Sequence, residues 1–298
     1  MSVDALPLPG TDDTEVVVPA PDAGPGNWVG AASAFLDGTT VYLAYRVRRP
    51  LTQGRGVGVV VARSEDGLTF ETVCQVHRSD FGAESLERPV VIRRPDGGWR
   101  LYVSCATPGS KHWWIEALDA DEPEDLPQGT RTIVLPGDDK TAVKDPVIIV
   151  RDGAWQMWVC EHPLDQPGHE DRMSTAWMTS SDGLDWTRHA TVLEPTPGSW
   201  DARGARVATV LGHDPLVVLY DGRSTAEDDR NEVTGVARAN GSHRLVPDPD
   251  TSIMRSPHGR GAFRYATSVE LPDGNVRFYV ERARPDGAHD LVTYLVRS

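Results

Sequence analysis

Hydrophobic and polar positions along this chain repeat with a period of about sixty residues. In each repeat a short apolar run is followed by an Asp-Gly pair and then by a second run that is rich in aromatic residues. The Asp-Gly pairs occupy positions 37–38, 96–97, 152–153 and 273–274, and a degenerate copy, Gly212-His213, fills the remaining gap. Because Asp-Gly is favourable in two-residue hairpin turns, each repeat predicts antiparallel strands joined by a tight turn.

Five such repeats fill the chain, and a long-period repeat of short strands is typical of a radial β array. We therefore expect an all-β fold, a five-bladed β-propeller with four-stranded antiparallel blades around a central pocket. Residues 1–26 are rich in Pro, Gly and Asp, and we expect them to form an N-terminal arm that lies along the outer surface or closes the ring. Residues 27–298 then form a single propeller domain.

Two near-identical segments occupy the same place in the first and third repeats. They read SEDGLTFETV at 64–73 and SSDGLDWTRHATVLEP at 180–195. The Ser and Asp side chains of this motif can cap backbone N–H groups of the turn, and Gly supplies the positive φ angle. We expect Phe70 and Trp186 to pack between blades. The tight Ser-x-Asp-Gly form resembles that of the five-bladed glycosidase superfamily, which includes the arabinanase/xylosidase, invertase/levansucrase and mannoside-phosphorylase families.

Composition excludes several classes of partner. The formal charge of -14 and the pI near 5.0 disfavour nucleic acids and anionic membranes, because the general field repels phosphate. The N-terminal segment lacks the basic and apolar regions of a signal peptide, and no apolar run approaches the ~18 residues of a membrane span, so we expect a cytoplasmic protein. The cysteines, Cys74, Cys105 and Cys160, stand in apolar runs and are expected to be buried thiols.

Charged residues are concentrated where inner strands begin and second strands end, and in a propeller these positions converge on one pocket. Such a set of alternating acids and arginines suits a wet, polar ligand such as a carbohydrate, with or without phosphate. The sequence has no P-loop, dinucleotide fingerprint or zinc-type cysteine spacing, so we expect no cofactor and no metal. The predicted site residues are Arg46, Glu87, Arg88, Asp145, Glu161, His162, Arg206, Asp221, Arg264 and Glu281.

The third repeat gives the best match to a known family. Its sequence VKDPVIIVRDGAWQMWVCEH is similar to the Asp-Pro inner strand of family-43 glycosidases, whose Asp holds and tunes the catalytic acid. The resemblance implies that role for Asp145. The alternative is an Asp that merely closes the start of the strand by accepting backbone N–H bonds.

The first two repeats resemble the mannoside phosphorylases of family 130. VYLAYRV is similar to the Leu-x-Tyr-Arg-x second strand of that family, and ESLERPVVI resembles its Glu-Asp-Pro-Arg strand start. When Pro89 is aligned with the family's proline, however, the catalytic Asp position is Arg88, which cannot donate a proton at neutral pH. The adjacent acid is Glu87. The basic Asp and the acidic Glu of family 43 also lack counterparts in NWVGAASAF and RGARVATVL.

These resemblances imply a glycoside hydrolase or phosphorylase-like enzyme that acts on a small glycoside or oligosaccharide. Asp145 and Glu87 would form the carboxylate pair, and Asp145→Asn should lower turnover while leaving the melting temperature nearly unchanged. The alternative is a catalytically inactive carbohydrate-binding propeller, which is favoured if cations hold both acids ionised; a scaffold with an outer binding surface is a third possibility. In the enzyme, Arg46, Arg88 and Arg206 would bind an anionic group, and Glu161 and His162 would orient hydroxyls.

Overall fold

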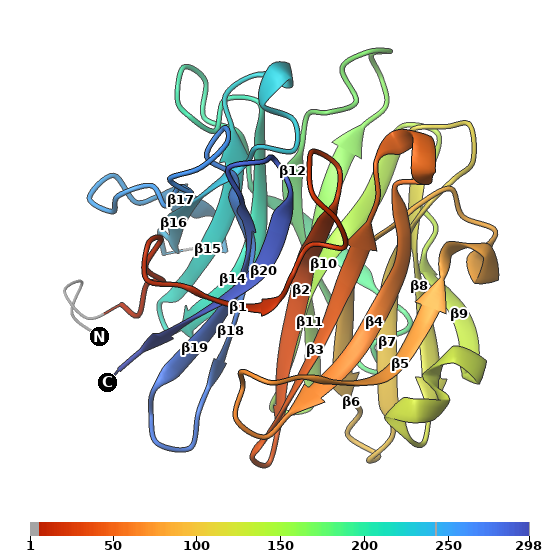
Figure 1. The fold of residues 1–298 in the computed structure, drawn as a ribbon. Helices are drawn as coiled ribbons and strands as arrows, with labels where there is room; N and C mark the ends of the chain where they lie inside the picture. Colours follow the sequence, from red (N-terminus) through yellow and green to blue (C-terminus); the bar gives the residue numbers. More distant parts are fainter. Residues whose placement is uncertain (1–5, 242, 298) are drawn as a thin grey trace.

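A computed structural model describes residues 6–241 and 243–297, and its regular secondary structure consists almost entirely of β-strands (Figure 1). Three sheets each contain four antiparallel strands in sequence order. This confirms the predicted all-β fold of four-stranded antiparallel sheets. The three sheets comprise β6 (Leu86–Arg93), β7 (Trp99–Ala106), β8 (Trp113–Ala120) and β9 (Thr130–Leu135); β10 (Thr141–Arg151), β11 (Ala154–Pro163), β12 (Ser174–Ser180) and β13 (Thr187–Leu193); and β14 (Gly204–His213), β15 (Leu216–Arg223), β16 (Val233–Ala239) and β17 (Leu245–Pro247).

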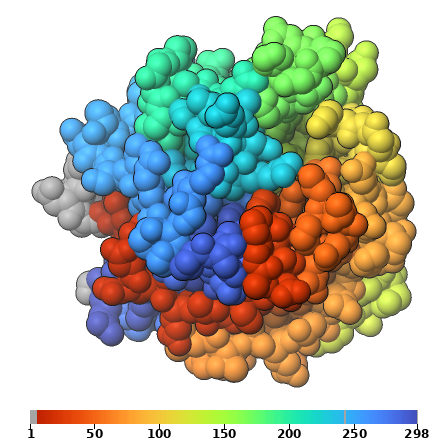
Figure 2. All heavy atoms as spheres, turned by 45° about the horizontal axis from the view of Figure 1, so that its top comes forward, coloured from red at the N-terminus to blue at the C-terminus, as the bar shows by residue number. Residues whose placement is uncertain are grey.

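The remaining eight strands join the beginning of the chain to its end. A parallel bridge between Trp28 and His289 links two antiparallel groups of strands into one sheet. Figure 2 shows the N-terminal segment, in red, lying against the C-terminal strands, in dark blue. One group is β2 (Trp28–Asp37), β3 (Thr40–Arg48), β4 (Gly56–Ser64) and β5 (Glu71–His77), and the other is β18 (Phe263–Glu270), β19 (Val276–Ala283), β20 (His289–Val296) and β1 (Glu15–Val18), which pairs with β20.

Short 3₁₀ helices occur in the connections between strands. They are η2 (Leu51–Gln53), η3 (Arg78–Phe81), η4 (Pro123–Gln128) and η5 (Ala226–Asp228). No helix of the described residues is long and apolar enough to cross a membrane.

Each Asp-Gly pair lies at a reversal between two antiparallel strands, but only Asp152-Gly153 forms the expected two-residue loop by itself, because the pairs at 96–97 and 273–274 lie in longer loops. At the β10–β11 turn both Asp152 and Gly153 have positive φ, 53° and 77°, as a two-residue hairpin requires. The degenerate copy differs, because Gly212 and His213 remain within β14 and the chain reverses after them, so that His213 pairs with Leu216. The apolar residues that follow this turn fix the register more strongly than the Gly-His pair does.

The hydrophobic core consists of five larger clusters, one between each two successive groups of strands. Second strands contribute to two clusters at once, because consecutive side chains of a strand point to opposite faces. Leu101 of β7 packs toward β4, for example, whereas Tyr102 packs toward Trp155 of β11. Side chains are therefore buried on both faces of these strands, as in β7. Cys74, Cys105 and Cys160 are buried free thiols, as expected.

Each inner strand is irregular near its start, and β14 is irregular at a second point as well. The register of pairing shifts in β2, β6, β10, β14 and β18, and each inner strand also contacts the next: β2 contacts β6, β6 contacts β10, β10 contacts β14, β14 contacts β18, and β18 contacts β2. At three of these shifts the backbone has positive φ, at Ala31, Asp145 and Tyr265. A β-bulge of this kind redirects a side chain out of the regular alternation. The bulges therefore determine which side chains meet between the inner strands.

Candidate functional site

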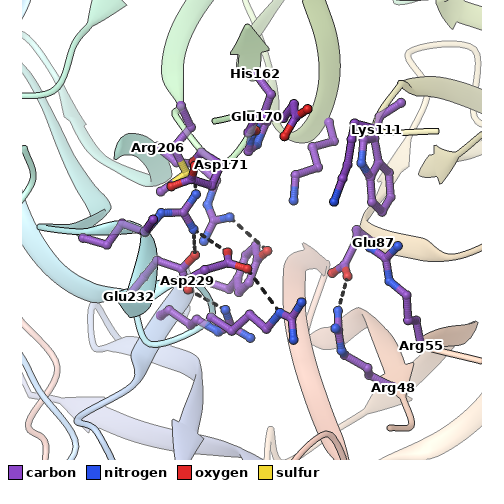
Figure 3. A pocket seen from close by; sticks show the side chains of 18 of the residues that line it. Arg48, Arg55, Glu87, Lys111, His162, Glu170, Asp171, Arg206, Asp229 and Glu232 are labelled. Carbon is purple, nitrogen blue, oxygen red and sulfur yellow. Dashed lines mark hydrogen bonds and ion pairs between the residues drawn. The ribbon is translucent and has the colours of Figure 1, made fainter. Parts of the chain in front are cut away.

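A pocket with a volume of ≈ 540 Å³ lies where the inner strands begin, and all five groups of strands supply lining residues. Figure 3 shows Arg48, Arg55, Lys111 and Glu87 on one side of it and Asp171, Asp229 and Glu232 on the other. We call it the charged pocket, because its lining includes Arg46, Arg48, Arg55, Lys111, Lys144, Arg206, Arg223, Arg230 and Arg264 as bases and Glu87, Glu170, Asp171, Asp229 and Glu232 as acids. These nine bases and five acids give it a local excess of positive charge in a protein of net charge -14.

Glu87 lies in the floor of the charged pocket between two arginines. Arg46 Nη1 donates to its Oε2 at 2.7 Å, and Arg48 Nη1 donates to its Oε1 at 2.9 Å. Burial alone would raise the pKa of Glu87, but the charges of Arg46 and Arg48 outweigh that effect and hold the pKa below its usual value. Glu87 therefore faces the pocket as a carboxylate, which can accept a proton or attack an electrophile but cannot serve as an acid at neutral pH.

Asp145 is fully buried and does not line the charged pocket. Its Oδ2 accepts from Arg206 Nη1 at 2.9 Å and from the Tyr265 hydroxyl at 3.3 Å, and Lys144 Nζ lies 3.3 Å away. Burial opposes ionisation, yet the charges of Lys144 and Arg206 keep the pKa of Asp145 well below its usual value. Its backbone N–H donates to Ser104 Oγ, so Asp145 supports the pocket floor from beneath.

Tyr265 lies at the bulge of β18 and lines the pocket. The guanidinium of Arg206 stacks 3.8 Å from the centre of its ring and donates to its hydroxyl at 2.9 Å. Burial raises the pKa of Tyr265 well above its usual value, so the side chain remains a protonated phenol. Sequence analysis missed this residue. The available signal was the repeat itself, in which Tyr265 occupies the position of Arg88 and Asp145.

A chain of buried ion pairs continues from Glu87 around the pocket. Arg46 also donates to Glu281 at 2.6 Å, Glu281 accepts from Arg264 at 2.7 Å, and Arg264 binds Glu232. Glu232 in turn accepts from Arg223 at 2.7 Å. Removing ions from water is costly, so this network is stable only because each carboxylate has cationic partners. Glu232, which sequence analysis also missed, precedes β16 and belongs to no repeated motif.

His162 lines the pocket as a neutral imidazole. Burial and the charge of Lys144 lower its pKa to about 3. Its Nδ1 lies 2.9 Å from the carbonyl oxygen of Glu170, which requires that Nδ1 carries the proton, and Nε2 lies 3.4 Å from Cys160 Sγ. Burial raises the pKa of Cys160 to about 12, so this cysteine is a thiol that donates to His162. The pair orients the ring at the pocket wall.

The ten residues predicted from the sequence fall into three groups. Glu161 lies away from the pocket, because its neighbour His162 points inward and successive strand side chains alternate. Glu161 instead binds Arg188 of β13 through both oxygens, at 2.7 and 2.8 Å, and so cannot contact a ligand in the pocket. Arg46, Glu87, His162, Arg206 and Arg264 line the pocket, whereas Arg88, Asp145, Asp221 and Glu281 are buried outside its lining.

Arg88 extends beneath the floor, where its Nη2 donates to the carbonyl oxygen of Ala208 at 2.6 Å. Burial lowers its pKa to about 10, a value at which it remains a cation at neutral pH. Asp221 is equally enclosed, because it accepts from Arg206 at 2.8 Å and from the Thr234 hydroxyl at 2.9 Å. Among residues 6–241 and 243–297, no group of three or more His, Cys, Asp and Glu side chains could hold a metal ion.

Comparisons with known proteins find similarity at the level of the fold. No protein-family model and no curated protein matches the chain. A solved glycoside hydrolase superposes with a TM-score of 0.75 at 11% identity, covering 97% of this chain and 93% of the other. A thermostable family-43 glycoside hydrolase gives 0.68 at 16% identity, covering 93% and 91%. A structure from the GH130 family of mannoside phosphorylases, described as containing hydrolases that target β-1,2 mannosidic linkages, gives 0.62 at 16%, covering 97% and 96%. The chain therefore shares the fold of these solved structures.

Proposed function

We propose that this chain is a glycoside hydrolase or phosphorylase-like enzyme that acts on a small glycoside or oligosaccharide in the charged pocket. The main observation in support is that all five groups of strands supply polar or charged side chains to one pocket. The aromatic ring of Trp113 also borders this pocket. Dense hydrogen-bonding groups beside an aromatic surface suit a carbohydrate. The same proposal takes the five groups as blades of a closed five-bladed propeller, supported by the cyclic contacts between inner strands.

The ionised state of Glu87 restricts its part in such an enzyme. Glycoside hydrolysis normally requires two carboxyl groups, one of which acts as an acid. Glu87 fits the other role, as base or nucleophile, because Arg46 and Arg48 keep it charged while it faces the pocket. Asp145 acts as a positioning residue, since it reaches the pocket only through Lys144, Arg206 and Tyr265.

We assign the proton donor to Tyr265. Tyr265 lines the pocket, and its hydroxyl accepts from Arg206 and donates to Asp145. Burial raises the pKa of the phenol and opposes release of its proton, whereas the charge of Arg206 favours that release. A phenol that gives its proton to a leaving oxygen becomes a phenolate, and Arg206 lies 3.8 Å from the ring to stabilise that charge. The arrangement suits phosphorolysis in particular, because phosphate then supplies the nucleophile and the protein needs to provide a donor and cations.

A carbohydrate-binding protein without catalytic activity is the second candidate. The specific observation in its favour is that cations hold both predicted carboxylates ionised, Glu87 through Arg46 and Arg48 and Asp145 through Lys144 and Arg206. Neither can then act as the usual carboxylic acid. A pocket of this kind binds sugar hydroxyls without cleaving the glycosidic bond.

The two candidates are separated by measuring turnover and binding on the same panel. Aryl glycosides and short oligosaccharides are incubated with the protein, with and without phosphate, and the products are assayed as free sugar and sugar phosphate. Hydrolysis that disappears in a folded Glu87→Gln variant, or phosphorolysis that disappears in a folded Tyr265→Phe variant, establishes the enzyme. Calorimetric binding without turnover establishes the binding protein. If no member of the panel is bound or cleaved, both proposals are wrong.

A further inference from the structure

We propose that one wall of the charged pocket is a subsite for an oxyanion, carried either by the sugar as a phosphate ester or carboxylate or by free phosphate. We call it the basic wall, and it consists of Arg48, Arg55, Lys111 and Lys144. The subsite deepens the proposed function, since the anion would lie beside the glycoside in the same pocket. It differs in position from the anion site predicted from the sequence.

The arginines predicted from the sequence are already neutralised or out of reach. Arg46 bridges Glu87 and Glu281, at 2.7 and 2.6 Å. Arg206 bridges Asp145 and Asp221, at 2.9 and 2.8 Å, and Arg88 lies beneath the floor. A ligand anion at Arg46 or Arg206 would have to compete with two carboxylates held at hydrogen-bond distance.

The cations of the basic wall are less fully paired with carboxylates than Arg46 and Arg206 are. Arg48 shares Glu87 with Arg46, and Arg55 reaches Glu84 at 3.4 Å, where both side chains are partly exposed. Lys144 lies 3.3 Å from Asp145, which it shares with Arg206, and within the described residues Lys111 forms no ion pair. A ligand anion would complete the charge balance of these side chains, and charge-assisted hydrogen bonds to oxyanions are stronger than neutral ones.

Trp113 fixes two of the cations in place. Lys144 Nζ lies 5.1 Å from the centre of its ring, and the Arg55 guanidinium lies 5.7 Å from it. Such cation–π contacts restrict long flexible side chains, so less ordering is required when an anion binds. Trp113 is itself buried, and its position at the start of β8 gives the wall a rigid base.

The opposite side of the pocket has the reverse character. Three of its five acids, Asp171, Asp229 and Glu232, lie away from the basic wall (Figure 3). Backbone N–H groups lower the pKa of Glu170, which also lies close enough to Lys111 for that charge to lower its pKa further. Arg203 binds Asp171, while Arg223 binds Asp229 and Glu232, so those acids already have cationic partners. An anionic group entering the pocket is therefore attracted to one side, and the neutral part of the ligand lies toward the other.

The lysines of the chain provide a direct test. There are three, Lys111, Lys140 and Lys144, and two of them belong to the basic wall, whereas Lys140 is exposed elsewhere. Pyridoxal 5′-phosphate, which carries a phosphate and an amine-reactive aldehyde, is added and trapped with borohydride, and labelled peptides are identified by mass spectrometry. We expect Lys111 to react about tenfold faster than Lys140 and to be protected by millimolar phosphate. A neutral aldehyde corrects for intrinsic reactivity.

Variants then measure the contribution of the wall to affinity. Inorganic phosphate, a hexose phosphate, a hexuronate and the neutral hexose are titrated calorimetrically into Lys111→Met and Arg55→Met, with Lys140→Met and Arg188→Met as matched controls outside the pocket. We expect a loss of about tenfold in the affinity of the bound anions for the two wall variants and no change for the controls. A hexose phosphate or hexuronate that binds tighter than phosphate places the anion on the sugar; equal affinity identifies free phosphate.

The inference is wrong if Lys111 and Lys140 label alike without protection, or if both wall variants retain the affinity of the wild type for every anion. Its failure is distinguishable from failure of the proposed function. If glycoside turnover is unchanged in both wall variants, the subsite is rejected while the proposed function stands. Anion binding at the wall without binding or cleavage of any glycoside rejects the proposed function alone.

Discussion

The Tyr102 hydroxyl donates a hydrogen bond of 2.8 Å to the carbonyl oxygen of Gly183, 81 residues later in the chain. Tyr279 makes the same bond to Gly67, at 3.0 Å. In both cases the glycine belongs to a Ser-x-Asp-Gly turn, and the tyrosine belongs to the second strand of the preceding group. Arg100 strengthens the first contact by donating to the Asp182 carbonyl at 2.6 Å. The motif thus joins neighbouring sheets as well as forming a turn.

Removal of this hydroxyl tests the contact. We expect Tyr102→Phe to lower the free energy of unfolding by about 1–3 kcal/mol, because the Gly183 carbonyl loses a buried donor. Urea denaturation measures the change, and Tyr279→Phe should give a loss of the same order. A variant as stable as the wild type would show that the carbonyl finds another donor.

The buried ion pairs make a second prediction. Arg46→Met leaves Glu87 and Glu281 with one fewer cation in a buried site, and we expect a loss of about 3–5 kcal/mol in stability. Arg188→Met is the matched control, since its pair with Glu161 is partly exposed and should contribute less than about 1 kcal/mol. Equal effects of the two substitutions on the urea midpoint would contradict the assignment of Arg46 to a buried network.

The pH dependence of stability provides a third prediction. The pKa of His162 falls to about 3 in the folded protein, from an ordinary value near 6.5, because burial and Lys144 disfavour the charged imidazole. Its stabilising contribution is therefore complete above pH 6.5 and is lost as the pH falls toward 3. At pH 5 we expect this loss to reach about 2 kcal/mol, and His162→Gln should remove that part of the pH dependence. Superimposable stability–pH curves would contradict it.

For Asp145→Asn the structure changes the expectation drawn from the sequence. An amide keeps the shape of Asp145 but leaves Lys144 and Arg206 without that negative charge. We now expect a loss of about 3–5 kcal/mol in stability together with reduced turnover, instead of an unchanged melting temperature. Thermal unfolding and the glycoside assay measure the two effects separately. An unchanged melting temperature would show that the ion pairs contribute little.

Tyr265→Phe tests the proposed proton donor. Loss of the hydroxyl should lower turnover by about 10²–10⁴-fold, the usual contribution of a general acid. The control is Tyr220→Phe, because Tyr220 is also buried and donates to an aspartate, Asp201, at 3.0 Å, but does not line the pocket. We expect that control to lose stability and retain turnover. If both variants remain active, the donor lies elsewhere.

Local patterns in the sequence were sufficient to predict the sheets. Asp-Gly pairs favour turns, and runs of apolar and aromatic side chains favour strands, so both features depend on residues close together in the chain. Ser64 and Asp66 illustrate this, since they accept the N–H groups of their own turn as expected. Phe70 packs edge-on against Tyr279, and Trp186 packs against the neighbouring sheet, which confirms the predicted wedges.

The site was harder to predict because long-range geometry determines it. Arg46 and Glu281 are 235 residues apart, and no local pattern indicates that each neutralises the other. A bulge decides that Asp145 points beneath the floor, while simple alternation removes Glu161 from the pocket. Lys111 comes from a loop between strands, where the repeat gives no register.

The bulge of the inner strands has a consequence for how such a protein can evolve. Ala31, Asp145 and Tyr265 occupy equivalent points with φ of 49°, 55° and 54°, so one backbone geometry carries a methyl group, an anion and a phenol. Hydrogen bonds of the strands hold that geometry, and the side chain takes little part in it. Single substitutions at these positions can therefore change the chemistry of the interior during evolution while the scaffold stays the same. The residues that maintain the fold are then different from the residues that determine the activity.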